Sequence, residues 1–194
     1  MANFHTKNLA NPTNRYILEH FEKSASFDKE TCIFLSHITS NKEAVIKIGE
    51  YITNAGFYIY LDIYDTDLQR GVENRDDHAI TECIEKGINN STDMLCIVSE
   101  ETKNSWWVPY EIGYGKKCEN SISTLLLKDV THIPSFLRIS NHLLKGTKSL
   151  NEYLEWLSPQ KVGYGLFEKS ASQPNIINYT APNHPLDAYL NWKE

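Results

Sequence analysis

The chain has 194 residues, with 19 Lys and Arg against 25 Asp and Glu, which gives a formal net charge of -6. That length is typical of one domain with extensions rather than of two full domains. Hydrophobic residues make up 41% of the chain and charged residues 23%, which excludes a disordered tail or a fibrous repeat. The acidic balance offers no cationic excess to a phosphate backbone, so we expect no nucleic-acid partner.

Secretion, membrane insertion and metal binding are not indicated either. The N-terminus lacks a charged start followed by an apolar run, and no apolar stretch is long enough to cross a bilayer. We therefore predict a cytoplasmic protein without a membrane partner. The four cysteines and seven histidines never group at the spacing of zinc ligands, so no metal is expected.

Residues 1–30 are predicted to form an N-terminal extension with a short helix. The polar segment 1–13 has no periodic apolar pattern and is expected to be loose. Thr13 then provides a helix cap, and Tyr16, Ile17 and Phe21 follow at helical spacing.

The domain predicted for residues 31–157 alternates strands with helices. Compact apolar runs predict buried strands, and segments with apolar residues three and four apart predict the helices between them. The predicted strands cover residues 31–35, 57–61, 94–98 and 122–127, and the predicted helices are capped by Ser40, Asp77, Ser105 and Ser149.

Three segments carry further local predictions. Residues 40–43 and 149–152 match the S-x-x-E capping box, in which both side chains satisfy backbone amides at a helix start. Residues 63–77 are expected to form a long polar loop with Gly71 inside it. Residues 158–194 mix prolines and glycines with scattered aromatics, which predicts an extended C-terminal arm packed on the domain or on a partner.

Strict alternation of strands and helices predicts right-handed crossovers and a parallel sheet covered on both faces. The predicted fold class is therefore α/β, a flavodoxin-like doubly wound parallel sheet. Ligands of such sheets bind beyond the carboxyl ends of the strands. In this chain those ends carry Ser36, His37, Asp62 and Ser99.

Missing motifs exclude several functions of doubly wound proteins. The chain has no GxxxxGK[ST] phosphate loop and no GxSxG nucleophile elbow. Gly113 and Gly115 lack the third glycine of a dinucleotide fingerprint and fall inside a predicted helix. Ser36 and His37 are neighbours on an extended chain, so their side chains point to opposite sides and do not form a catalytic dyad.

The segment SWWVPYE at residues 105–111 is what remains as a candidate site. Trp107 and Glu111 are four residues apart on a predicted helix, which puts them on one face and in reach of a common ligand. The start of that helix carries partial positive charge, which is useful near a diphosphate. From these residues alone, a tryptophan packed in the core beside a solvated glutamate remains the simpler alternative.

The order and spacing of several segments from Thr31 to Lys128 resemble a Toll/interleukin-1 receptor (TIR) domain. The matching segments are FLSH at 34–37, YLD at 60–62, MLCIVS at 94–99 and SWWVPYEIG at 105–113. The two tryptophans followed by Pro-Tyr-Glu-Ile-Gly resemble the bacterial branch, especially the stand-alone TIR proteins of Thoeris antiphage systems.

This resemblance implies an enzyme that cleaves the nicotinamide–ribose bond of NAD, an NAD glycohydrolase or ADP-ribosyl cyclase. NAD is then the substrate, and no cofactor is implied. Glu111 takes the position of the catalytic residue, where an ionised carboxylate stabilises positive charge that develops on the ribose. Asp62 either contacts substrate or shapes the loop after its strand. The implied substrate-binding residues are Trp107, Ser36, His37, Asp62 and Trp106.

The resemblance also implies a product and partners. Attack by water yields ADP-ribose, whereas attack by a group of the same molecule yields a cyclic isomer. Thoeris-like TIR proteins make a cyclic or conjugated product as a signal for a separate effector protein. The resemblance further implies self-association through TIR surfaces, with residues 63–77 completing a neighbour's active site.

Two other functions stay open. The first is a TIR interaction or scaffold module without catalysis, against which the combination of Glu111 with two tryptophans counts. The second is a nucleoside deoxyribosyltransferase-like hydrolase, which shares the sheet topology and also uses a glutamate on glycosidic bonds. The spacing of Trp107 and Glu111 counts against this second alternative.

Overall fold

A computed structural model of the chain describes residues 2–23, 30–158 and 184–192. Its centre is a five-stranded parallel sheet in the order β2-β1-β3-β4-β5. The predicted doubly wound α/β class is confirmed, and β1 to β4 coincide with the four predicted runs. The short β5 was missed, because three residues show no pattern. The strands are β1 (Cys32–Ser36), β2 (Tyr58–Tyr60), β3 (Asp93–Val98), β4 (Ser121–Leu126) and β5 (His142–Leu144).

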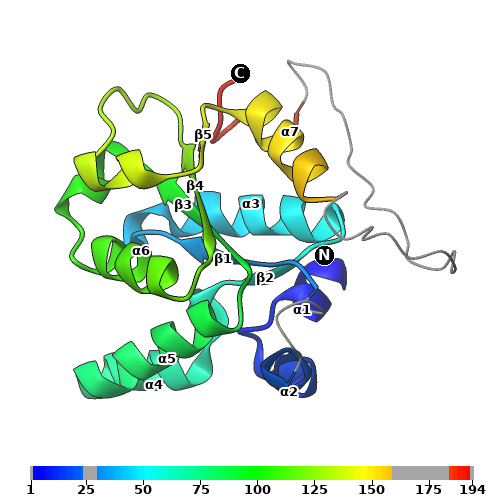
Figure 1. Cartoon of the computed structure of the whole chain (residues 1–194), viewed down its shortest axis with the longest axis vertical. Coiled ribbons are helices and arrows are strands. Elements are labelled where there is room, and N and C mark those ends of the chain that lie inside the picture. The colour runs from blue at the N-terminus through cyan, green and yellow to red at the C-terminus, as the bar shows by residue number, and fades with distance from the viewer. Residues whose placement is uncertain (1, 24–29, 159–183, 193–194) are drawn as a thin grey trace, which may run out of the picture.

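Helices cover both faces of this sheet. Figure 1 shows α5 and α6 on one side of the strands and α3 and α7 on the other. No helix in the described ranges has the length and the apolar character needed to cross a bilayer. The α-helices are α1 (Ala2–Lys7), α2 (Arg15–Lys23), α3 (Lys42–Asn54), α4 (Thr66–Asn74), α5 (Asp77–Asn89), α6 (Trp107–Lys117) and α7 (Thr147–Leu157).

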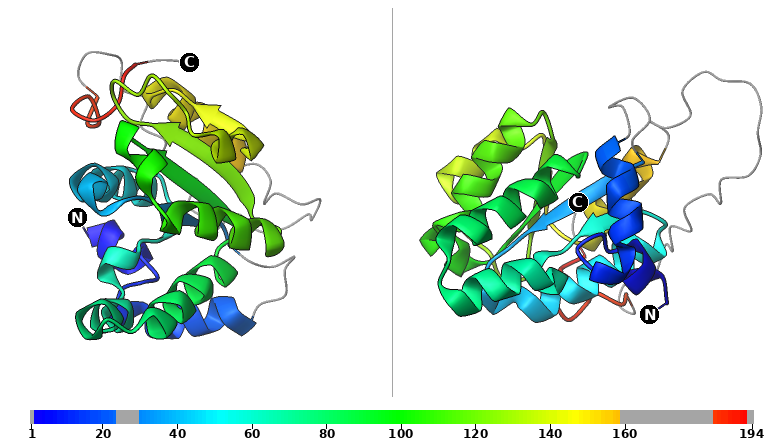
Figure 2. Two further views of the ribbon diagram at one scale, coloured as in Figure 1. Left: turned by 90° about the vertical axis from the view of Figure 1, so that its left-hand side faces the viewer. Right: turned by 90° about the horizontal axis from the view of Figure 1, so that it is seen from below.

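Successive strand residues alternate between two buried clusters, one on each face of the sheet. On one face, α3 and α7 pack against Ile33 and Leu35 of β1. On the other face, α5 and α6 pack against Phe34 of β1 and Met94 of β3. Both faces are therefore buried, as the continuous apolar runs predicted, and the sheet lies between two helical layers (Figure 2).

The N-terminal segment is folded, so the prediction that residues 1–13 are loose is wrong. Phe4 of α1 is buried in the cluster that α3 and α7 share. Asn8 forms a parallel bridge with Ile59, and the Leu9 amide donates to the Ile59 carbonyl at 2.8 Å. This segment covers the edge strand β2, whose backbone groups would otherwise face solvent. Pairing with a distant strand leaves no periodic signal in a short segment.

Residues 63–77, predicted as a loop, contain the helix α4. Asp65 caps it, since its carboxylate accepts hydrogen bonds from the amides of Asp67 and Leu68. A Cβ atom at Gly71 would meet Cγ1 of Ile80 at 3.1 Å, so glycine lets α4 approach α5 closely. The helix buries little of its own surface, which is why its apolar pattern is too sparse to predict it.

The predicted capping boxes do not form, although both helices do. The short 3-10 turn η2 (Thr39–Asn41) precedes α3, and Ser40 donates to Oε2 of Glu101 at 2.8 Å instead of capping the helix. The helix α7 begins at Thr147, and Ser149 accepts from two backbone amides that precede it. In both places the serine is used by a contact that the local pattern does not contain.

Residues 184–192 return to the domain. Leu186 and Leu190 are buried in the cluster of α3 and α7. The Lys128 amide donates to the Tyr189 carbonyl at 2.8 Å, which joins this segment to the loop after β4. The greater part of the predicted C-terminal arm, residues 159–183, lies outside the described residues.

Candidate active site

A cavity of about 560 Å³ opens at the carboxyl ends of β1, β2 and β3. Its volume is in the range of small-molecule sites. The strand order reverses between β1 and β3, which is where ligands of doubly wound sheets bind. His37 follows β1, Asp62 follows β2, and Ser105 lies in the loop after β3, so the cavity occupies the predicted edge of the sheet.

Glu111 reaches this cavity from the second turn of α6 and is only 3% exposed. Ser36, the last residue of β1, donates a hydrogen bond to Oε2 of Glu111 at 2.5 Å. Burial, aided by the negative charge of Asp62, raises the pKa of Glu111 to about 8, and the Ser36 hydrogen bond opposes part of this rise. Glu111 is therefore mostly protonated at neutral pH, which corrects the expectation of an ionised carboxylate.

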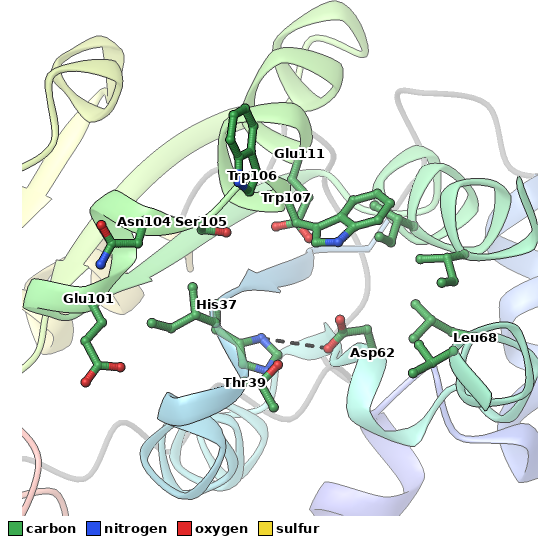
Figure 3. Close-up of a pocket in the computed structure, with 14 residues that line it drawn as sticks. His37, Thr39, Asp62, Leu68, Glu101, Asn104, Ser105, Trp106, Trp107 and Glu111 are labelled. Carbon is green, nitrogen blue, oxygen red and sulfur yellow. Dashed lines mark ion pairs between the residues drawn. The ribbon is translucent and has the colours of Figure 1, made fainter. Parts of the chain in front are cut away.

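Asp62 and His37 face each other across one side of the cavity (Figure 3). Nδ1 of His37 lies 3.8 Å from Oδ1 of Asp62 and 3.0 Å from the Leu35 carbonyl oxygen. Because a carbonyl oxygen only accepts, Nδ1 carries the proton and donates to Leu35. Burial raises the pKa of Asp62, and the nearby imidazole opposes that rise. The imidazole of His37 thus lies beside the Asp62 carboxyl group without a close hydrogen bond to Oδ1.

The two tryptophans lie at the opening of the cavity rather than in the core. Trp106 is 90% exposed and Trp107 is 39% exposed. In Figure 3 the indole of Trp107 extends over the space that Asp62 faces, whereas Trp106 points away from it. The ring of Tyr110 supports Trp107 in an edge contact at 6.0 Å. The alternative of a packed tryptophan beside a solvated glutamate is wrong, since the glutamate is the buried member of the pair.

The structure brings most of the predicted site residues together. Glu111, Trp107, Trp106, His37 and Asp62 all line the cavity. Ser36 does not line it and contacts Glu111 instead. Its predicted role beside substrate therefore becomes, in the structure, a hydrogen bond that holds the carboxyl group.

An apolar wall of the cavity was missed at the sequence level. This wall comes from α4 and α5, and it stands beside the indole of Trp107. Recognition of residues 66–74 as a helix would have revealed it, because leucine and valine are then four residues apart on one face. The wall consists of Leu68, Val72, Ile80 and Ile84.

The remaining lining of the cavity is polar, and its ionisable groups are mainly acidic. Asp62, Glu101 and Glu111 contribute carboxyl groups, and no lysine or arginine is among the described residues that line it. Such a cavity attracts the positively charged part of a ligand more than a diphosphate. The combination of an acidic floor, an apolar wall and a flat indole fits a cationic aromatic ring joined to a polar group.

The β2-β1-β3-β4-β5 parallel sheet, with a Trp–Glu pair on the helix after β3, defines a TIR-type domain. A family model described as "Thoeris protein ThsB, TIR-like domain" matches residues 34–131, and the chain belongs to this family. A probable 3' cyclic ADP-D-ribose synthase, ThsB', from Bacillus cereus (strain MSX-D12) is 26% identical over 143 residues, covering 71% of this chain and 72% of that protein. The predicted resemblance to Thoeris TIR proteins is confirmed.

Proposed function

We propose that the chain is an NAD-processing enzyme of Thoeris antiphage defence that cleaves the bond between nicotinamide and ribose, with Glu111 as catalytic residue. One observation carries the proposal: a buried carboxyl group with a raised pKa lies in a cavity, one helical turn from an exposed indole. Membership of the ThsB TIR-like family supports it, as does the name of the Bacillus cereus relative.

The chemistry needs one carboxylate. When the bond breaks, its electron pair goes to the pyridinium nitrogen, nicotinamide leaves neutral, and C1′ of the ribose gains oxocarbenium character. Ionised Glu111 stabilises that positive charge in a site shielded from water. The free protein holds Glu111 protonated, and a bound pyridinium cation favours the ionised form, because opposite charges stabilise each other.

We further propose that the ADP-ribosyl group leaves as a cyclic or conjugated product rather than as ADP-ribose. The name of the Bacillus cereus relative, a probable 3' cyclic ADP-D-ribose synthase, supports this product. The product then acts on a separate effector protein. Self-association through TIR surfaces is part of the same proposal.

A non-catalytic scaffold is the weaker alternative. Burying Glu111 costs stability at neutral and alkaline pH, and a docking platform has no use for a buried carboxyl group beside an open cavity. The nucleoside deoxyribosyltransferase-like hydrolase is disfavoured by the match to the ThsB TIR-like family.

The test is incubation of the purified protein with NAD, with and without extract of phage-infected cells, and mass spectrometry of the products. We expect free nicotinamide and an ADP-ribose-derived product. Glu111→Gln should reduce turnover by about 100-fold or more, with the melting temperature within a few degrees of wild type.

Glu152→Gln is the matched control, because Glu152 is exposed on α7 and does not line the cavity. Its turnover should equal that of the wild type. Wild-type turnover in Glu111→Gln would show that another residue is catalytic. Absence of nicotinamide release from the wild type under both conditions would reject NAD cleavage.

A further inference from the structure

A third polar side chain lies behind Ser36 and Glu111. Cys96 of β3 is opposite Ser36 of β1 in the register of the parallel sheet, and its side chain belongs to the face that α6 covers. Cys96 is fully buried and Ser36 is 1% exposed. The three residues therefore come together from β1, β3 and α6, in a part of the protein that solvent does not reach from the sheet side.

The thiol of Cys96 keeps its proton. Burial, aided by the negative charge of Glu111, raises the pKa of Cys96, and a hydrogen bond with the Ser36 side chain opposes part of that rise. A neutral thiol is a weak donor, and its sulfur is a weak acceptor. The Ser36 hydroxyl group thus lies between the Cys96 thiol on one side and the Glu111 carboxyl group on the other.

Two arrangements of the protons are possible. In the first, the thiol donates to the Ser36 oxygen and the Ser36 hydroxyl donates to Oε2 of Glu111, 2.5 Å away. In the second, Glu111 donates to Ser36 and the hydroxyl donates to the sulfur. The first arrangement is favoured, because it gives the hydroxyl proton to the stronger acceptor and needs no rotation of Ser36 when Glu111 ionises.

The other carboxyl oxygen of Glu111, Oε1, is left for the cavity. Within the described ranges Ser36 is the hydrogen-bond partner of the Glu111 side chain, and it takes Oε2. Oε1 is not one of the buried atoms that lack both a partner and contact with solvent. In Figure 3 the Glu111 carboxyl group points from α6 toward the space between Trp107 and His37.

We propose that Cys96 and Ser36 form a hydrogen-bonded relay, from thiol to hydroxyl to Oε2, that holds Glu111 with Oε1 toward the cavity. In the free protein the carboxyl proton is then on Oε1, from which it leaves directly into the cavity when Glu111 ionises. Ser36 and Cys96 are positioning residues, since neither lines the cavity. The relay itself does not depend on the proposed function, whereas its effect on turnover does.

The first experiment is infrared spectroscopy of the purified protein without substrate, from about pH 5 to pH 10. The band of the protonated Glu111 carboxyl group is the one that Glu111→Gln lacks, and the S–H band of Cys96 is the one that Cys96→Ala lacks. Ser36→Ala should raise the midpoint of the Glu111 titration by about 1 to 2 pH units, because the ionised form loses a hydrogen bond. It should also move the S–H band to higher wavenumber, because the thiol loses its acceptor.

Two changes at Cys96 test the far end of the relay. Cys96→Ser keeps a donor and should keep the midpoint of the wild type, whereas Cys96→Ala should raise the midpoint by less than Ser36→Ala does. The matched control is Cys32→Ala, because Cys32 is an equally buried cysteine on the same face of the sheet. Its midpoint should equal that of the wild type.

Asp62, at the end of β2, and Cys96 are the titratable groups that act on the Glu111 pKa in the described part of the chain. Both remain in Ser36→Ala, so a moved midpoint reports the lost hydroxyl group. The second experiment measures kcat/KM for NAD against pH in this variant. The loss should be about tenfold or more at pH 7 and should shrink above the new midpoint, whereas a structural defect would lower kcat/KM equally at every pH.

An S–H band that stays in place in Ser36→Ala would overturn the proposal, because it would show that the thiol does not donate to Ser36. An unchanged Glu111 midpoint in that variant would overturn it as well. If the wild type does not turn over NAD, the proposed function has failed, and the infrared results still decide on the relay. A moved midpoint with an unchanged pH profile of kcat/KM would keep the relay and reject its effect on turnover.

Discussion

Two buried polar clusters in this molecule are completed in different ways. Between α3 and α7, Nδ1 of His184 accepts from the Leu186 amide at 3.1 Å, so Nε2 carries the proton and donates to the Tyr51 hydroxyl at 3.2 Å. That hydroxyl donates in turn to Oδ1 of Asn151 at 2.7 Å. At the carboxyl ends of the strands, in contrast, Oδ1 of Asp62 is left without a donor.

The two clusters have different effects on the stability of the protein. The closed chain through Tyr51 stabilises the return of residues 184–192 to the domain and needs nothing from outside. The open cluster around Asp62 and Glu111 costs stability, because burial raises the pKa of both carboxyl groups. The closed chain is structural, whereas the carboxyl groups of Asp62 and Glu111 line an open cavity, an arrangement typical of a ligand site.

The largest expected effect on stability comes from Leu190, a core residue in the same segment as His184. Leu190→Ala removes a side chain that is 1% exposed and should lower the free energy of unfolding by about 2 to 5 kcal/mol. Urea denaturation checks this value. NAD turnover per folded molecule should not change, and a large loss of turnover in the folded variant would show that the two regions are coupled.

The hydrogen-bond chain itself gives the next effect. Tyr51→Phe leaves the His184 imidazole and the Asn151 amide without their shared partner and should cost about 1 to 3 kcal/mol in the same denaturation experiment. Tyr16→Phe is the control, because Tyr16 is 72% exposed and its substitution should be neutral. Equal stability of the two variants would show that the hydrogen bonds of Tyr51 do not stabilise the fold.

The pH dependence of activity tests the open cluster. With a pKa of about 8 and an ionised catalytic form, kcat/KM for NAD should rise about tenfold between pH 7 and pH 9 and level off above that pKa. A pH-independent kcat/KM over this range would show that Glu111 is ionised in the free protein.

Ionisation of Glu111, which should raise activity as pH rises, should lower the stability of the folded protein. The folded protein holds the Glu111 proton more tightly than the unfolded chain does, so the contribution to stability is present below the unfolded pKa of about 4.3 and is lost as pH rises to about 8. Glu111→Gln should lack this slope when unfolding is measured across that window.

The smallest expected effect distinguishes the two tryptophans. Trp106→Ala should change the free energy of unfolding by less than about 0.5 kcal/mol, because the side chain is 90% exposed. Trp107→Ala should cost more stability, about 1 to 3 kcal/mol, because its indole is only 39% exposed, and it should lower kcat/KM for NAD by about tenfold, since the indole covers the cavity. Equal kinetics for the two variants would remove Trp107 from the binding site.

Much of the fold could be predicted because its signals are local. The apolar runs of β1 to β4 and the periodic helices between them need no tertiary information. The helix α4 and the strand β5 could not be predicted, since short elements with few buried residues have no clear period. Phe4 and Leu190 belong to the core although both come from segments without regular patterns.

The sequence by itself determined the parallel α/β class, the edge of the sheet where ligands bind, and the shared face of Trp107 and Glu111, because strand runs and helical spacing follow from local residue order. Only the tertiary structure decided that Glu111 is buried and protonated, that Ser36 holds it, and that Asp62 presents an open acceptor. The pKa of a carboxyl group and the lack of a donor for an acceptor depend on burial and on neighbours far along the chain, which no local pattern records.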